Sequence, residues 1–146
     1  MEFVQAKLGK IVIARLYEDE DLLETINQAA KRSNINTGVF SLIGTLKRAA
    51  VQFYHERKYE TIHIEGPLEI VSCTGNISLK ENQPFAHAHI ALSDEKGNVK
   101  GGHLMQGCII GATGELMLIE ASDLRIIRKY DKKTNLFLLS MEKKLL

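Results

Sequence analysis

The strongest constraint on this chain is a run near its middle, residues 85–92, in which small, polar and apolar side chains alternate. Successive side chains of a β-strand point to opposite faces. His87 and His89 therefore share one face, while the even-numbered apolar residues from Ala86 to Leu92 share the other. The second face has the composition of a core, so the run predicts a half-buried strand with two imidazoles on its polar side.

A polar turn and a second short strand follow this run. A three-residue loop at residues 95–97, with Gly97 in the left-handed conformation, would pair His89 with His103 in a β-hairpin. Directly opposed residues have Cβ atoms about 4.5–5.5 Å apart, and His87 lies two places along on the same face. Three imidazoles then converge within one local segment. A shift of one residue would move His103 to the other face, so the prediction depends on this register.

The three predicted metal ligands are His87, His89 and His103. Three imidazoles with a fourth position left to water or substrate are typical of a catalytic zinc site rather than a structural one. Zinc is the expected cofactor, and another divalent transition metal is the alternative, because geometry selects among these ions. Gly101 and Gly102 would leave room beside His103. The competing interpretation is a solvated polar face, with the two glycines marking a β-bulge.

Size, charge and cysteine content narrow the class of protein. The chain has 146 residues, which suits one domain over residues 1–146 with a substantial core. Its formal net charge of +1 gives no sign of a strongly basic nucleic-acid binder. Cys73 and Cys108 stand singly in apolar runs, which favours buried, reduced thiols in an intracellular protein.

No segment of the sequence indicates membrane insertion or export. The first residues lack a basic stretch followed by an apolar one. The longest runs without charge, residues 33–46 and 101–114, are shorter than the roughly 20 apolar residues that a membrane-spanning helix needs. We therefore expect a cytoplasmic protein.

The periodicity of apolar residues predicts one helix and many strands. Residues 19–33 open with acidic side chains and repeat apolar residues at helical spacing. Gly44 and the pair Gly66-Pro67 are expected to interrupt strands. The expected fold class is α+β, a mostly antiparallel sheet flanked by one main helix. The expected strands are residues 8–16, 39–43, 47–54, 59–64, 68–79, the histidine hairpin, 115–121, 124–130 and 136–140.

Three stretches of the sequence match a known family pattern. The first is residues 69–75 followed by Asn76-Ile77-Ser78, the second is Pro84-Phe85-Ala86-His87-Ala88-His89, and the third is Gly97-x-Val99-x-Gly101-Gly102-His103-Leu104. Supporting matches occur at residues 15–16, 43–46 and 128–131. Together they resemble the plant and prokaryote conserved domain, the PPC domain, in its prokaryotic single-domain form. The resemblance covers essentially the whole chain.

This resemblance carries its own expectations. It implies an antiparallel sheet with a flanking helix, assembled as a homotrimer, in which the three histidines of prokaryotic members can hold zinc. The fold is also similar to that of acetolactate decarboxylase, a zinc enzyme with comparable histidine ligands. No substrate follows from that likeness, because one fold hosts many functions.

The first class of function is metal-dependent binding or catalysis of a small molecule whose identity the sequence leaves open. Such a site needs a proton-transfer group and an anion-binding group near the metal. Arg15 and Glu69 are the candidates because both lie in family-like stretches, and Glu115 and Glu120 are alternatives. The competing interpretation for all four is a surface or ion-paired role.

The second class is a regulatory protein that binds DNA or a partner protein. Plant members of the family contact DNA through a separate AT-hook, an Arg-Gly-Arg-type segment that suits narrow A·T minor grooves, and this sequence has no such segment. Phosphate contacts from basic side chains would instead give salt-sensitive affinity. The competing interpretation is a solvated strand end. The basic residues in question are Arg125, Arg128, Lys129, Lys132, Lys133, Lys143 and Lys144, against Asp123, Asp131 and Glu142.

Overall fold

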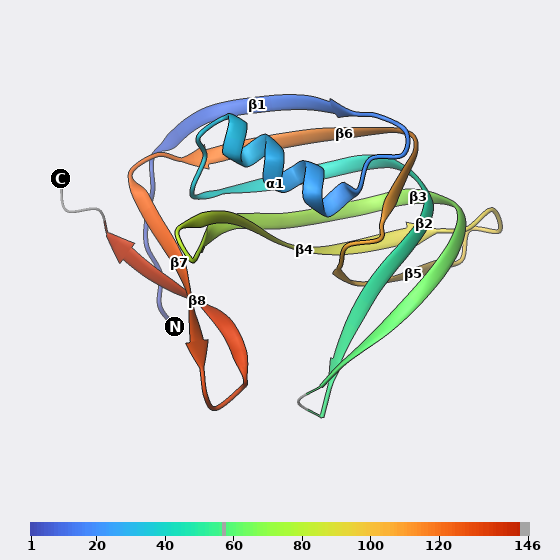
Figure 1. The fold of residues 1–146 in the computed structure, drawn as a ribbon. Coiled ribbons are helices and arrows are strands. Elements are labelled where there is room, and N and C mark those ends of the chain that lie inside the picture. The colour runs from blue at the N-terminus through green and yellow to red at the C-terminus, as the bar shows by residue number, and fades with distance from the viewer. Residues whose placement is uncertain (57, 144–146) are drawn as a thin grey trace.

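The fold is a mostly antiparallel β-sheet with one helix, as a computed structural model of residues 1–56 and 58–143 shows (Figure 1). This confirms the predicted α+β class. The elements are β1 (Leu8–Leu16), α1 (Leu22–Arg32), β2 (Gly38–His55), β3 (Lys58–Lys80), β4 (Gln83–Ser93), β5 (Val99–Leu104), β6 (Ile109–Ala121), β7 (Leu124–Asp131) and β8 (Leu136–Lys143).

The strands form one sheet in the order β1-β6-β2-β5-β4-β3-β7-β8, and β2 additionally pairs with β3. Because β2 pairs with both β3 and β5, and β4 pairs with both as well, these four strands form a closed circuit of pairings. The far ends of β2 and β3 leave the body of the sheet as a ribbon, and β7 and β8 form a second projecting hairpin (Figure 1).

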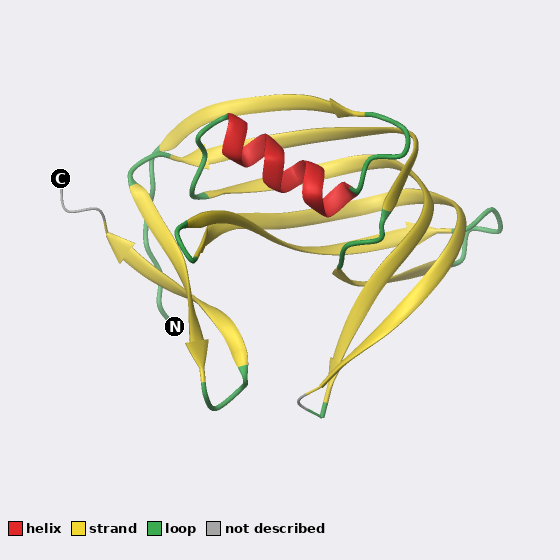
Figure 2. Cartoon of the chain, in the orientation of Figure 1, coloured by secondary structure: helices red, strands yellow, loops and turns green. Residues whose placement is uncertain are grey.

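Helix α1 covers one face of the sheet (Figure 2). Its first turn is capped by Asp21, whose Oδ1 accepts a hydrogen bond from the Glu24 amide at 3.0 Å. Leu22, Ile26 and Ala30 are fully buried at its contact with the sheet. The core therefore lies between α1 and this face, while the opposite face carries no helix of the described residues. None of those residues forms a helix with the length and apolar composition needed to cross a bilayer.

Two strand breaks predicted from the sequence are wrong. Gly44 and Gly66-Pro67 lie within single continuous strands, where they cause local irregularities. Gly44 has φ 145° and sits at a register shift inside β2, so it bends the strand without ending it. Gly66 and Pro67 fall at a second shift, where β3 has more residues than the facing part of β2. Proline lacks an amide donor, and a bulge is where a strand tolerates that loss.

The hairpin register predicted from the sequence is confirmed. His89 pairs with His103, and the loop closes through hydrogen bonds between Asp94 and Asn98 and from the Gly97 amide to the Asp94 carbonyl. Gly97 has φ 78°, the left-handed conformation that the loop requires. On the other side of β4, the even-numbered residues from Ala86 to Leu92 are at most 3% exposed.

Both cysteines are buried free thiols, as the sequence predicted. Burial raises the pKa of Cys73 to about 12 and that of Cys108 to about 11, so both stay protonated at neutral pH. The Cys108 thiol donates a hydrogen bond to the Ala50 carbonyl, 3.3 Å away. These thiols therefore belong to the core rather than to a reactive site.

Candidate metal centre

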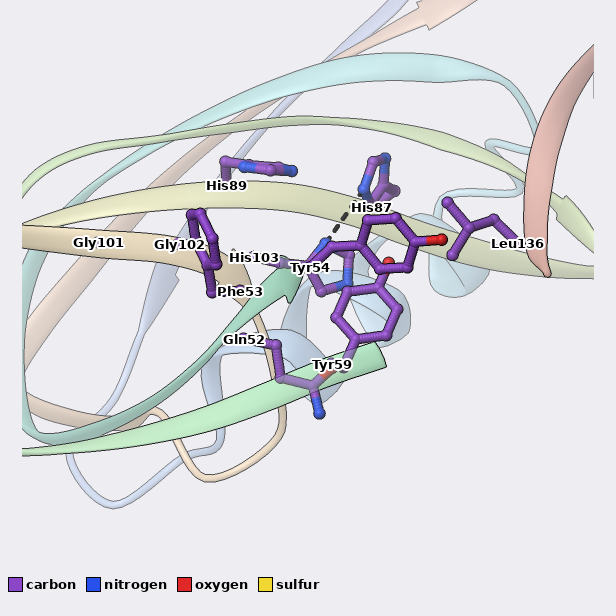
Figure 3. A pocket seen from close by; sticks show the side chains of 10 residues that line it. All are labelled: Gln52, Phe53, Tyr54, Tyr59, His87, His89, Gly101, Gly102, His103 and Leu136. Carbon is purple, nitrogen blue, oxygen red and sulfur yellow. Dashed lines mark hydrogen bonds between the residues drawn. The ribbon is translucent and has the colours of Figure 1, made fainter. Parts of the chain in front are cut away.

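The imidazoles of His87, His89 and His103 surround one point on the helix-free face of the sheet (Figure 3). Each ring offers a nitrogen, and these three ligand atoms all lie within 4.8 Å of one another. His87 Nε2 and His103 Nδ1 are 3.2 Å apart. The ring centroids are separated by 4.8 to 5.5 Å. The group is thus arranged so that it can hold a metal ion.

Close backbone packing holds the third histidine in place. A Cβ atom at Gly101 would lie 2.1 Å from the Ile90 carbonyl oxygen, and one at Gly102 would lie 2.8 Å from the Gln52 carbonyl oxygen. The two glycines therefore allow β5 to approach β4 on one side and β2 on the other. His103 follows them and pairs with residues of both strands. The β4–β5 pairing is regular throughout, so the glycines do not mark a bulge.

The electrostatic surroundings keep two of these rings in the form that binds metal. Burial, and then the positive charge of Arg128, lower the pKa of His87 from 6.5 to about 4. Burial also lowers the pKa of His103. Positive charge on the neighbouring His89 and Arg128 lowers it further. Both rings are consequently neutral at pH 7, and a neutral ring nitrogen is what coordinates a metal ion.

A cavity of about 450 Å³ opens over the three histidines (Figure 3). The ribbon of β2 and β3 supplies Tyr54 and Tyr59 to its wall, and β8 supplies Leu136. The Tyr59 ring packs in a tilted orientation against both the His103 ring and the Tyr54 ring, with centroid distances of 5.7 Å and 5.1 Å. The Tyr54 hydroxyl donates to the Thr134 carbonyl at 2.8 Å. This bond joins the two projecting hairpins, so the cavity is walled by both.

The four charged residues considered from the sequence lie elsewhere in this chain. Arg15 on β1 faces Glu115 on β6, and Glu120 lies on the same strand. Glu69 pairs with Ser93, four positions along β4 from His89 and so about 13 Å away at the usual rise per residue. None of the four lines the histidine cavity. A role for Arg15 or Glu69 at the metal therefore needs a second subunit and stays a prediction.

Arg128 is the site residue that sequence reasoning misplaced. The sequence pattern places it among the basic residues of the C-terminal region, whose competing interpretation is a solvated strand end, but the structure has it partly buried against β3. Its guanidinium donates to Asn76 Oδ1 at 2.9 Å and to Ser78 Oγ at 3.0 Å. Both partners come from the family-like stretch at residues 76–78. That match was the signal in the sequence that could have pointed to this part of the site. In the same basic group, Lys132 and Lys133 are exposed, the Lys143 side chain is not described, and Lys144 lies outside the described residues.

Comparison with known proteins identifies the family. A family model for the Plants and Prokaryotes Conserved (PCC) domain matches residues 4–122. The chain belongs to this family, the PPC domain family. A plant- and prokaryote-conserved (PPC) protein from Pyrococcus horikoshii is 37% identical, with a TM-score of 0.87 over 99% of this chain and 100% of the other.

Other similar proteins show how far the likeness extends. A metal-containing protein from Archaeoglobus fulgidus is 31% identical, with a TM-score of 0.87 over 94% of this chain and 98% of that one. A candidate DNA-binding protein from Bacteroides thetaiotaomicron is 24% identical with a TM-score of 0.84, over 94% and 99% of the two chains, and shows the fold alone. The bifunctional protein GlmU of a Synechococcus strain is 29% identical over 88% of this chain but only 20% of its own length. The chain thus spans about a fifth of the curated relatives it matches.

The depressed pKa of His87 gives a direct test of the site's electrostatics. In protein stripped of divalent metal, we expect the His87 ring to titrate near pH 4 in an NMR titration, rather than near 6.5. Arg128→Met should raise this pKa, because it removes a nearby positive charge. Since the unfolded chain binds this proton first as pH falls, the unfolding free energy should decrease between pH 6.5 and about 4.

Lys132→Met is the control, because this exposed lysine lies in the turn between β7 and β8, outside the cavity lining. It removes the same charge and should leave the pKa of His87 unchanged. A parent protein in which His87 titrates near 6.5 would contradict the arrangement described above.

Proposed function

We propose that this PPC domain binds or converts a small molecule at a zinc ion held by His87, His89 and His103. The observation that carries the proposal is the convergence of three imidazole nitrogens within 4.8 Å at the base of a cavity of about 450 Å³. A relative described as metal-containing, 31% identical over nearly the whole chain, supports it. Another divalent transition metal would use the same ligands.

The donor set fits zinc of the catalytic type. Three imidazole nitrogens would leave a further ligand position to water or substrate, which is typical of catalytic rather than structural zinc sites. Bound zinc would polarise a carbonyl oxygen or lower the pKa of a coordinated water. The surrounding residues Gln52, Tyr54 and Tyr59 supply polar groups to the same cavity. Their part is to orient the ligand and restrict the access of water.

Metal content tests this proposal directly. Tag-free protein purified without added metal should contain close to one zinc or other transition metal per chain by plasma mass spectrometry. His89→Ala removes one of three ligands and should lower the retained metal at least tenfold after dialysis, with the fold kept in circular dichroism, because the His89 side chain is exposed.

The matched control is His63→Ala, which removes an exposed histidine that does not line the cavity. It should retain the metal of the parent. A parent protein that holds no metal after incubation with zinc and dialysis would refute the metal site.

We also infer that the chain assembles as a homotrimer through the helix-free face. Exposed apolar side chains gather there on three adjacent strands, and Ile13 pairs directly with Met117. Contiguous exposed apolar patches of this kind mark interaction surfaces. The residues are Ile11 and Ile13 on β1, Met117 on β6, and Val39 and Ile43 on β2, each 47 to 77% exposed.

Light scattering coupled to gel filtration should therefore give a mass of about 49 kDa, three times the 16.4 kDa of one chain. Ile13→Glu places a charge in the patch and should shift the protein to smaller species. Gln83→Glu adds the same charge at an exposed position near the β3–β4 turn and should leave the mass unchanged. A monomeric parent at micromolar concentration would refute the homotrimer.

A cytoplasmic location completes the proposal. Its support is the pair of buried free thiols, Cys73 and Cys108, because reduced cysteines are typical of reducing compartments.

DNA binding is the second candidate function. The observation that favours it is the exposed pair Lys132 and Lys133 in the turn between β7 and β8, together with relatives described as candidate DNA-binding proteins. The structure weakens this class in one respect. Arg128, counted among the basic residues, points its guanidinium toward β3.

For DNA bound through this turn, the Lys132→Gln/Lys133→Gln variant should bind a labelled duplex more weakly. The plot of log affinity against log salt concentration has a negative slope, and this slope should become less steep by about two, because each lost phosphate contact contributes roughly 0.9. Fluorescence anisotropy over a salt series measures both quantities. An unchanged affinity and slope would remove the turn as a DNA-binding element.

A further inference from the structure

A second cavity, of about 370 Å³, adjoins the histidine cavity. The two share His87, His103 and Tyr59 in their walls. Strand β5 pairs with β4 only as far as His89, so the edge of β4 at His87 is open on this side. A molecule in the second cavity therefore lies next to two of the three proposed metal ligands.

Arg128 is fixed in the wall of this second cavity by neutral groups. Its guanidinium donates to Asn76, to Ser78 and to the Phe137 carbonyl, at 2.9 to 3.2 Å. Ser78 is fully buried, so this anchor is rigid. A guanidinium has five N–H donors, and three are engaged here, which leaves two for a ligand.

Lys80 places a second positive charge in the same wall. Its ammonium lies 4.2 Å from the Phe137 ring centroid and 5.2 Å from that of Phe85. Arg128 lies 5.6 Å from the same Phe85 ring. The two cations thus flank one aromatic ring, which contributes cation–π attraction but no negative charge.

No counter-ion balances these two charges among the described residues. None of the ion pairs found there involves Lys80 or Arg128. No aspartate or glutamate among the described residues lines either cavity. Removing cations from water without a partner costs free energy. An anion that enters this cavity should therefore form a stronger interaction with the two cations than it would at an exposed site.

The rest of the cavity wall indicates the chemical character of the ligand beyond its charged group. Leu23, Leu104, Leu136 and Leu138 give the second cavity an apolar lining beside the two cations. This suits a short carbon chain better than a bare inorganic ion. The planar guanidinium fork matches the geometry of a carboxylate.

We propose that the second cavity binds the carboxylate of a small organic acid on Arg128 and Lys80, with a carbonyl or hydroxyl oxygen of the same molecule directed toward the three histidines. The inference rests on the proposed metal function, for which it names the class of ligand. Arg128 is then a binding residue, and the two adjoining cavities hold the two ends of one molecule.

The test is isothermal titration calorimetry with 2-oxobutyrate and 2-hydroxybutyrate as probes, on both zinc-loaded and metal-free protein. We expect binding of at least one acid, tighter in the zinc-loaded form. Lys80→Gln and Arg128→Gln should each weaken it by about tenfold, the usual loss for one charge-assisted interaction, with unchanged zinc content. The neutral amides of both acids should bind at least tenfold more weakly than the acids.

Lys132→Gln is the matched control, because it removes one exposed lysine outside the cavity and should leave acid binding unchanged. Lys80→Gln keeps the test decisive if Arg128→Gln disturbs the fold, since the Lys80 ammonium lies against the Phe85 and Phe137 rings and takes no part in the hydrogen bonds that anchor Arg128.

Three results would overturn the proposal, and all are separable from failure of the metal site. Stoichiometric zinc without binding of either acid would refute the anion site alone, as would acid binding that both variants retain. Inorganic phosphate that binds more tightly than the acids through Arg128 would overturn the assignment to carboxylates. Acid binding to a protein that takes up no zinc, lost in the variants, would support the anion site and refute the metal function.

Discussion

The pairing of β4 with β5 is the constraint on which the candidate site depends. The hairpin brings His89 opposite His103, and the buried even-numbered residues of β4 prevent a shift by one position, because such a shift would expose them. Gly101 lets β5 approach β4 so closely that a single methyl group would overlap the Ile90 carbonyl. The same backbone contact thus sets the strand register and the distances between the imidazole rings.

Arg128 connects the electrostatics of the two cavities. Its neutral hydrogen-bond partners leave its charge uncompensated, and that charge helps to keep His87 and His103 deprotonated. The positive charge favours metal binding because it keeps the ligand nitrogens deprotonated. It also opposes metal binding, because a nearby cation repels a divalent ion. An anion seated on the guanidinium would reduce that repulsion. Binding of an acid and binding of a metal ion should therefore reinforce one another, and by linkage they do so reciprocally.

The sequence predicted the parts of the site that are local. The register, the left-handed Gly97 and the buried face of β4 all follow from residues within one hairpin. Arg128 was misplaced because its position depends on β7 meeting β3, a contact between segments 50 residues apart. The strand breaks expected at Gly44 and Gly66-Pro67 were wrong for a related reason. Glycine and proline signals mark irregular backbone, but only the partner strand decides whether that irregularity is a bulge or an end.

The face of the sheet that lacks a helix links assembly with the site. Cross-strand pairs run from Ile13 through Met117, Ser41 and Thr74 to His89, so the apolar residues and the histidines point to the same side. A subunit that covers the apolar residues would therefore lie beside the exposed ring of His89 and reduce the access of water to it. Because desolvation strengthens electrostatic interactions, the metal affinity of an assembled protein should differ from that of a single chain. If the chain assembles as proposed, assembly is a second determinant of the site, in addition to the hairpin that builds it.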